Sequence, residues 1–165
     1  MRENEDFLAW CLDKNRGIRR VEPSDNLAKA YQLESKTALR SMQVNAQAGI
    51  LEWAVSASYY ARYFASYSVL AKIGIKCGIH DCTIALFEYL LGNRVPAHMI
   101  RELKRSKENR VELQYYTTEW RVDLMRLEKE TREFLLEIEK ILDGLTQNEI
   151  ASLRSRFQSL DWQSG

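Results

Sequence analysis

The sequence predicts an all-α fold, an up-down bundle of four to five main helices. The chain has seven glycines and two prolines in 165 residues, and so few helix breakers favour long helices over hairpins. No stretch carries a strand signal. The segment 50–73 places large rings on more than one face of a helix, which is typical of a helix covered by neighbours on several sides. We therefore expect 50–73 to be the central helix of the bundle.

The first part of the chain predicts a short helix, a basic loop and a long helix. Residues 3–13 are amphipathic, and the segment 14–20 that follows them is basic and loop-like. The run Pro23-Ser24-Asp25-Asn26 offers an N-cap for a helix that extends to about Asn45. The apolar face of that helix is expected to contain Leu27, Tyr31, Ala38 and Met42.

The central helix and the one after it are bounded by glycines. Gly49 breaks the pattern before residue 50, and Gly74 begins the turn that follows residue 73. Trp53 belongs to the apolar face of the central helix, so we expect its ring to be buried. A helix from His80 to Leu91 comes next, with Asp81 near the positive end of its dipole.

The rest of the chain predicts three more helices. A polar helix covers 97–118, and an amphipathic helix covers 121–142 with Gly144 as its C-cap. Thr146 and Glu149 have the spacing of a capping box. They open a last helix whose apolar face contains Ile150, Leu153, Phe157 and Leu160. The expected organisation is a helix and basic loop in 1–23, a bundle in 24–144 and a C-terminal helix in 145–165.

Composition limits the classes of partner and the compartment. With 24 Lys and Arg against 23 Asp and Glu, the net charge is +1, so a nucleic-acid partner would need a local basic patch. The odd number of cysteines and the polar N-terminus predict a cytoplasmic protein. The segment 50–73 is long enough to span a bilayer, but Glu52, Arg62 and Lys72 argue against it. We expect a soluble protein with no membrane partner.

Two clusters of side chains could bind a ligand. Tyr59, Tyr60, Tyr63 and Tyr67 could stack on a base, although rings at helical spacing more often pack in a core. The densest basic stretch of the chain could contact phosphate, or it could be a solvated helix face with ion pairs inside the helix. It consists of Arg101, Lys104, Arg105, Lys107 and Arg110.

A third cluster could in principle bind a metal. Cys77, His80, Asp81 and Cys82 lie within six residues, but no second pair of ligands accompanies them elsewhere. We therefore expect a buried pair of thiols, Cys77 and Cys82, beside a histidine at a helix start. The sequence predicts no metal site and no cofactor.

The order of several motifs resembles the small prokaryotic HEPN-domain proteins. The motifs are Ser56-Ala-Ser-Tyr-Tyr-Ala-Arg-Tyr-Phe64, the Gly74-Ile75 turn, His80, and Ile84-Ala-Leu-Phe87, followed by Arg110 with Tyr115 and Tyr116. The resemblance covers about 24–142. It implies a helical bundle that is usually a homodimer and is often encoded beside a minimal nucleotidyltransferase, as in toxin–antitoxin pairs.

Many HEPN proteins are metal-independent ribonucleases, and this sequence departs from their motif. The motif is an arginine, four to six residues, and a histidine, which accepts the proton of the ribose 2′-hydroxyl while arginine holds charge on the phosphate. Here Tyr115 stands at the histidine position, and Thr117 stands where the family has an AMP-accepting tyrosine. We therefore expect a cleft that has lost its imidazole, and we assign no catalytic residue; a remodelled site would use Arg110 and His80, or His98.

Three functions remain open from the sequence. The first is a non-catalytic module that binds nucleotide or RNA, or docks a nucleotidyltransferase. The second is a ribonuclease toxin with a remodelled site, and the third is a structural adaptor that dimerises through its central or C-terminal helices. For the first, the expected binding residues are Arg110, Tyr115, Tyr116, Tyr59, Tyr63, Arg101, Lys104, Arg105 and Lys107.

Overall fold

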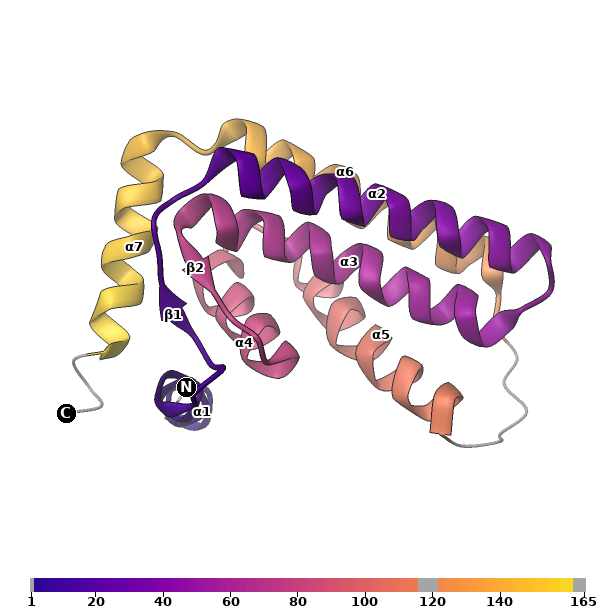
Figure 1. Cartoon of the computed structure of the whole chain (residues 1–165), viewed down its shortest axis with the longest axis horizontal. Coiled ribbons are helices and arrows are strands. Elements are labelled where there is room, and N and C mark those ends of the chain that lie inside the picture. The colour runs from indigo at the N-terminus through magenta and orange to yellow at the C-terminus, as the bar shows by residue number, and fades with distance from the viewer. Residues whose placement is uncertain (1, 116–121, 162–165) are drawn as a thin grey trace.

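The computed structural model describes residues 2–115 and 122–161, and it is almost entirely helical (Figure 1). The helices are α1 (Arg2–Asp13), α2 (Asp25–Gln47), α3 (Leu51–Ile73), α4 (His80–Leu91), α5 (Ala97–Tyr115), α6 (Leu124–Gly144) and α7 (Gln147–Asp161). Two short strands, β1 (Arg19–Arg20) and β2 (Ile75–Lys76), complete the described elements. The all-α fold class predicted from the sequence is confirmed.

Helix α3 is the centre of the bundle, as the sequence predicts. It packs against α2, α4, α5, α6 and α7, and most of its side chains from Ala54 to Ile73 are buried. In Figure 1, α2 and α6 lie along one side of α3, while α4 and α5 lie on the other. A helix with neighbours on so many sides cannot be amphipathic, which explains its rings on several faces.

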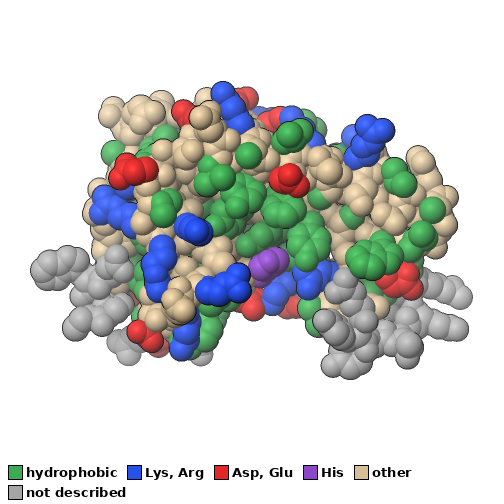
Figure 2. All heavy atoms as spheres, viewed as in Figure 1, with side chains coloured by type: hydrophobic (Ala, Val, Ile, Leu, Met, Phe, Trp, Pro, Cys, Tyr) green, Lys and Arg blue, Asp and Glu red, His purple; other side chains and the backbone are tan. Residues whose placement is uncertain are grey.

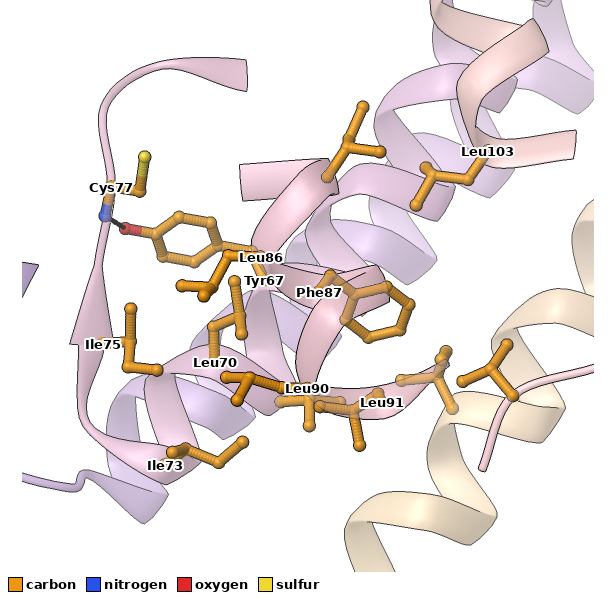
Figure 3. Packing of buried hydrophobic residues seen from close by; sticks show 14 of the residues in the cluster. Tyr67, Leu70, Ile73, Ile75, Cys77, Leu86, Phe87, Leu90, Leu91 and Leu103 are labelled. Atoms are coloured by element: carbon orange, nitrogen blue, oxygen red, sulfur yellow. Dashed lines mark hydrogen bonds between the residues drawn. The ribbon is translucent and has the colours of Figure 1, made fainter. Parts of the chain in front are cut away.

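The main core surrounds α3 and contains buried side chains of α1, α4, α5, α6 and α7. Figure 3 shows Tyr67 and Leu70 of α3 facing Leu86, Phe87 and Leu90 of α4. The Tyr67 hydroxyl reaches the rim of this core, where it accepts a 2.9 Å hydrogen bond from the backbone N–H of Cys77. This bond satisfies a buried hydroxyl and fixes the loop that leads to α4.

The basic segment 14–20 contains a short strand where the sequence predicts only a loop. Arg19 pairs with Lys76 and Arg20 with Ile75 in an antiparallel ladder. Gly74 allows this pairing because it adopts φ 86°, a left-handed conformation that caps α3 and that side chains rarely tolerate. Two-residue strands carry no periodic signal, so this ladder depends on tertiary contact.

Cys11 and Cys82 form a disulfide that ties α1 to the first turn of α4. The expected pair of thiols, Cys77 and Cys82, is therefore wrong: Cys77 alone is a free, buried thiol. The sequence separation between Cys11 and Cys82 is 71 residues, so no local spacing indicated the pairing. The division of the chain into 1–23, 24–144 and 145–165 stays a prediction.

Most predicted helix ends agree with the structure. The Ser24 side chain accepts a hydrogen bond from the Leu27 N–H at 3.1 Å. The Thr146–Glu149 capping box forms in both directions, with N–H to side-chain distances of 2.8 and 3.3 Å. The prediction of Gly144 as a C-cap is wrong, because Gly144 is the last helical residue and Leu145 is the cap.

Three apolar residues that we expected in the core are exposed. Trp53 is 61% exposed, Ile50 is 42% exposed and Leu27 is 43% exposed. Ile50 is the N-cap of α3 and Leu27 lies in the first turn of α2. Trp53 lies in the first turn of α3, where its neighbour Ala54 is buried against α2 and α6 but Trp53 is not. By contrast, all four predicted apolar residues of α7 are buried.

None of the described helices combines the length and the apolar character that crossing a bilayer requires.

Candidate phosphate-binding cleft

Arg110 of α5 lies against the rings of α3. Leu103, Ser106 and Arg110 follow one another on the face of α5 that packs on α3, at helical spacing. The Arg110 Nη1 donates a 2.9 Å hydrogen bond to the Tyr60 hydroxyl. Its Cζ is 5.3 Å from the Tyr60 ring centroid and 5.4 Å from that of Tyr59. The guanidinium is thus held by two aromatic faces through cation–π contacts.

His80, the first residue of α4, reaches the same rings. Its imidazole stacks on Tyr63 at 4.1 Å between centroids with planes 8° apart. The His80 Nδ1 lies 2.6 Å from the Tyr59 hydroxyl oxygen. Tyr60 presents its ring edge-on to the imidazole at 6.3 Å. Arg110 and His80 therefore share both Tyr59 and Tyr60 as neighbours.

The prediction that this cleft lacks an imidazole is wrong. Tyr115 does replace the histidine of the Arg–x4–6–His motif, but His80 comes to the arginine from a different helix. A linear spacing rule cannot detect this arrangement, because His80 precedes Arg110 by a full helix and a loop. The cleft therefore contains both a guanidinium, from Arg110, and an imidazole, from His80.

The environment favours the neutral form of His80. Burial lowers the pKa of the imidazole most, and the positive charges of Arg110 and Lys107 lower it further, while Asp81 opposes them. Burial also raises the pKa of the Tyr59 hydroxyl, which therefore keeps its proton. Near neutral pH the cleft contains one fixed positive charge, on Arg110, and a neutral imidazole.

The tautomer of His80 follows from Tyr59. The Tyr59 side chain is fully buried, and His80 Nδ1 is the partner of its hydroxyl among the described residues. A buried hydroxyl proton needs an acceptor, so Tyr59 donates to Nδ1 and the imidazole proton is on Nε2. In this state Nε2–H is a hydrogen-bond donor rather than a base.

Two of the predicted basic residues are neutralised by α4. Lys107 pairs with Asp81 at 2.5 Å, and Lys104 pairs with Glu88 at 2.6 Å. The alternative of ion pairs inside the α5 helix is therefore wrong for these lysines, whose partners lie on the adjacent helix. These two ion pairs cancel part of the positive charge that the sequence predicts for α5, on the side of the helix next to α4.

Arg101 and Arg105 do not join the cleft. Both are exposed, and Arg105 lines a separate cavity of about 410 Å³ between α3, α5 and α6. Arg62 contributes to the same cavity, together with Glu102 and Glu130. Arg62 is 1% exposed, and its Nη1 donates to Ser58 Oγ at 3.1 Å.

Tyr115 closes α5, but its side chain lies outside the described residues, as do Tyr116 and Thr117 entirely. Of the remaining predicted site residues, Tyr59 and Tyr63 are buried beside His80, as packing rings rather than as open surfaces. His98 is exposed near the start of α5. Among residues 2–115 and 122–161 there is no group of three or more metal-ligating side chains.

Tyr60 belongs to the tyrosine cluster noted in the sequence, but it is absent from the binding residues expected there. Tyr60 is half-buried and is the hydrogen-bond partner of Arg110. It follows Tyr59 directly, so it faces a different side of α3, and a helical projection combined with the solvent exposure could have separated the two. Figure 2 shows a histidine on the viewed face, among hydrophobic side chains with Lys and Arg on both sides.

The fold and the cleft define a helical-bundle protein with an arginine and an imidazole set against α3 tyrosines. A family model described as HEPN domain matches residues 28–152, which is most of the chain. The chain belongs to the HEPN family, so the resemblance seen in the sequence is confirmed. No curated protein matches the chain. The family is related to nucleotides and RNA.

Proposed function

We propose that this HEPN domain is a non-catalytic module that binds a phosphate group of a nucleotide or of RNA at the cleft formed by Arg110 and His80. The guanidinium supplies a permanent positive charge and the imidazole supplies Nε2–H as a donor. Both groups recognise phosphate oxygens well, and charge-assisted bonds of this kind are about twice as strong as neutral ones.

The observation that supports this proposal is the unpaired charge of Arg110. The side chain is half-buried, yet no carboxylate among the described residues lies within ion-pair distance of it. Its contacts are a tyrosine hydroxyl and two rings, and its Nε is buried without a hydrogen-bond partner. A partly desolvated cation without a counter-ion favours an anionic ligand.

The test is the affinity of the purified protein for a labelled single-stranded RNA and for AMP. Arg110→Ala should weaken both by roughly tenfold or more, the equivalent of one charged hydrogen bond. Arg40→Ala is the matched control, because it removes the same charge from an exposed position on α2. Equal affinities for the wild type and Arg110→Ala, insensitive to salt, would remove the proposed site.

A ribonuclease is the second candidate, and the closeness of His80 to the Arg110 cleft favours it. In that reaction the imidazole accepts the 2′-hydroxyl proton and the guanidinium holds the phosphate charge. The Tyr59 hydrogen bond opposes this role, because it leaves the proton on Nε2. Incubation with RNA in EDTA decides between the two: we expect no cleavage, whereas cleavage that disappears in His80→Ala and persists in His98→Ala would establish the ribonuclease.

The partners expected from the family are part of this proposal. A homodimer and a minimal nucleotidyltransferase, in a toxin–antitoxin-like pair, are both compatible with exposed apolar side chains near the α2–α3 turn. Val44, Ile50 and Trp53 are 57%, 42% and 61% exposed. Light scattering at micromolar concentration tests the dimer, and a monomer there would contradict it. Co-purification with a nucleotidyltransferase encoded next to the gene tests the second partner.

A further inference from the structure

A row of half-buried rings leads away from Arg110 across α3 to α2. It begins with Tyr60, the hydrogen-bond partner of Arg110. The Tyr60 ring stacks on Phe64 with centroids 5.8 Å apart, and Phe64 stacks on Tyr31 of α2 at 6.1 Å. All three rings are partly exposed, whereas Tyr59, Tyr63 and Tyr67 beneath them are buried. We call Tyr60, Phe64 and Tyr31 the ring row.

The far end of the ring row approaches the basic β1–β2 ladder. Tyr31 contacts Tyr67 at 4.5 Å, and the Tyr67 hydroxyl binds the backbone of Cys77, directly after β2. Lys76 and the adjacent Arg19 are exposed on this ladder. In Figure 2 a band of hydrophobic side chains crosses the same view of the molecule, with Lys and Arg side chains on either side. Positive charge therefore lies beside Tyr60, on Arg110, and again on the ladder, which is linked to Tyr31 through Tyr67 and Cys77.

The three residues of the ring row lie at the edge of the core, packed against it but not enclosed by it. Tyr59 and Tyr63 are covered, while each residue of the ring row keeps part of its surface open to solvent. Aromatic surfaces beside cationic groups are the usual means by which proteins bind unpaired bases, since every base has a face that can stack. Paired bases are stacked inside a duplex and cannot reach such rings.

We propose that the ring row is a stacking surface for the unpaired bases of single-stranded RNA whose phosphate is bound at Arg110. This inference rests on the proposed function, because Arg110 provides the phosphate contact at one end of the row. It specifies the ligand: a single-stranded oligonucleotide with bases, in preference to a mononucleotide, a duplex or a bare phosphate backbone. The RNA backbone extends from Arg110 toward the β1–β2 ladder.

The first experiment separates bases from phosphates. Fluorescence anisotropy measures the affinity for a single-stranded hexanucleotide, for the same backbone without bases, and for a duplex of the same sequence. We expect the affinity for the intact single strand to exceed that for the abasic strand by about fivefold or more, since each stacked base contributes to affinity. Equal affinities for intact and abasic strands would overturn the stacking surface and leave the phosphate site standing.

The second experiment tests the rings themselves. Phe64→Leu and Tyr31→Leu should each weaken binding of the intact strand about fivefold or more, and leave binding of the abasic strand unchanged. Tyr89→Leu is the matched control. Tyr89 is also half-buried, but it lies on α4 and its ring contacts the guanidinium of Arg156 on α7. Circular dichroism and thermal unfolding of each variant verify that the bundle is intact.

The outcomes distinguish this inference from the function on which it rests. If Arg110→Ala abolishes binding while both ring variants bind like the wild type, the phosphate site holds and the ring row is wrong. If neither AMP nor any RNA binds the wild type, the proposed function fails and the ring row fails with it. If the ring variants weaken abasic and intact strands equally, the rings act on the fold of the cleft, and the stacking role is wrong.

Discussion

Arg62 and Arg110 make nearly the same local contacts and lie in opposite electrostatic surroundings. Each donates one Nη1 hydrogen bond to a hydroxyl on α3, Ser58 for Arg62 and Tyr60 for Arg110. Each has a buried Nε without a hydrogen-bond partner among the described residues. Burial lowers the pKa of Arg62, but the charges of Glu102 and Glu130 act to raise it. Arg110 has rings and His80 as neighbours instead of carboxylates.

The difference indicates which buried cation is structural and which can bind a ligand. Arg62 makes no ion pair with a described carboxylate, but the negative charges of Glu102 and Glu130 act on it from inside the protein. Glu130 also pairs with Arg126 at 2.6 Å, so removing Arg62 mainly weakens the counter-charge of Glu102. Arg110 has no such counter-charge among the described residues, so an external anion can supply it. The five predictions below test this contrast and the surroundings of the two arginines, and those with the greatest expected effect come first.

Arg62→Ala should lower the free energy of unfolding by about 3 kcal/mol, because it removes a fully buried side chain and the positive charge that acts on Glu102. Urea denaturation followed by circular dichroism measures the change. A loss of less than about 1 kcal/mol would show that the charge of Arg62 is not needed by the nearby acids. The proposed difference between Arg62 and Arg110 would then be wrong.

Arg110→Ala should lower the free energy of unfolding by about 1 kcal/mol, well below the effect of Arg62→Ala, since one hydrogen bond is lost and no acid is stranded. The same urea titration measures it. The ligand affinity of this variant should fall although its fold persists. A stability loss as large as that of Arg62→Ala would assign Arg110 a structural role in place of ligand binding.

The stability of the protein should depend on pH through His80. Its pKa in the folded state is lowered, so the unfolded state binds more protons between that pKa and the ordinary value of about 6.5. The contribution of His80 is complete above about pH 6.5 and is lost as the pH falls through the folded-state pKa. Denaturation at several pH values for the wild type and His80→Phe should show this dependence only in the wild type.

The imidazole can also be observed directly by NMR. The chain has two histidines, and the exposed His98 gives a second signal in the same spectrum. His80 should titrate below the ordinary range and, when neutral, should show the Nε2–H tautomer. A neutral Nδ1–H tautomer would mean that His80 donates to Tyr59, and the ribonuclease candidate would gain support.

Trp53→Ala should have the smallest effect, within about 0.5 kcal/mol of the wild-type free energy of unfolding, because surface substitutions usually change little. Trp53 lies on the same helix as Arg62 but is 61% exposed. Chemical denaturation at low protein concentration is the measurement. A loss near 3 kcal/mol, typical of a buried aromatic ring, would mean that another chain covers this residue in solution.

Local signals along the chain are enough to predict the helices and most of their ends. The capping residues bond to backbone groups only a few positions away, so a short stretch of sequence is enough to predict them. These residues are Ser24, Thr146 with Glu149, and Gly74. Periodicity identified α3 as central for the same reason, because a helix surrounded by others must carry apolar groups on every face. The order of the motifs also pointed to the family that the comparison confirms.

The site, in contrast, depends on how the helices pack together. His80 and Arg110 meet because α4 and α5 both pack on the rings of α3, and no spacing along the chain encodes that packing. The same packing gives Lys104 and Lys107 their acidic partners, leaves Trp53 uncovered and joins Cys11 to Cys82. Charge balance and burial depend on which helices become neighbours, which is a property of the assembled bundle rather than of any one segment.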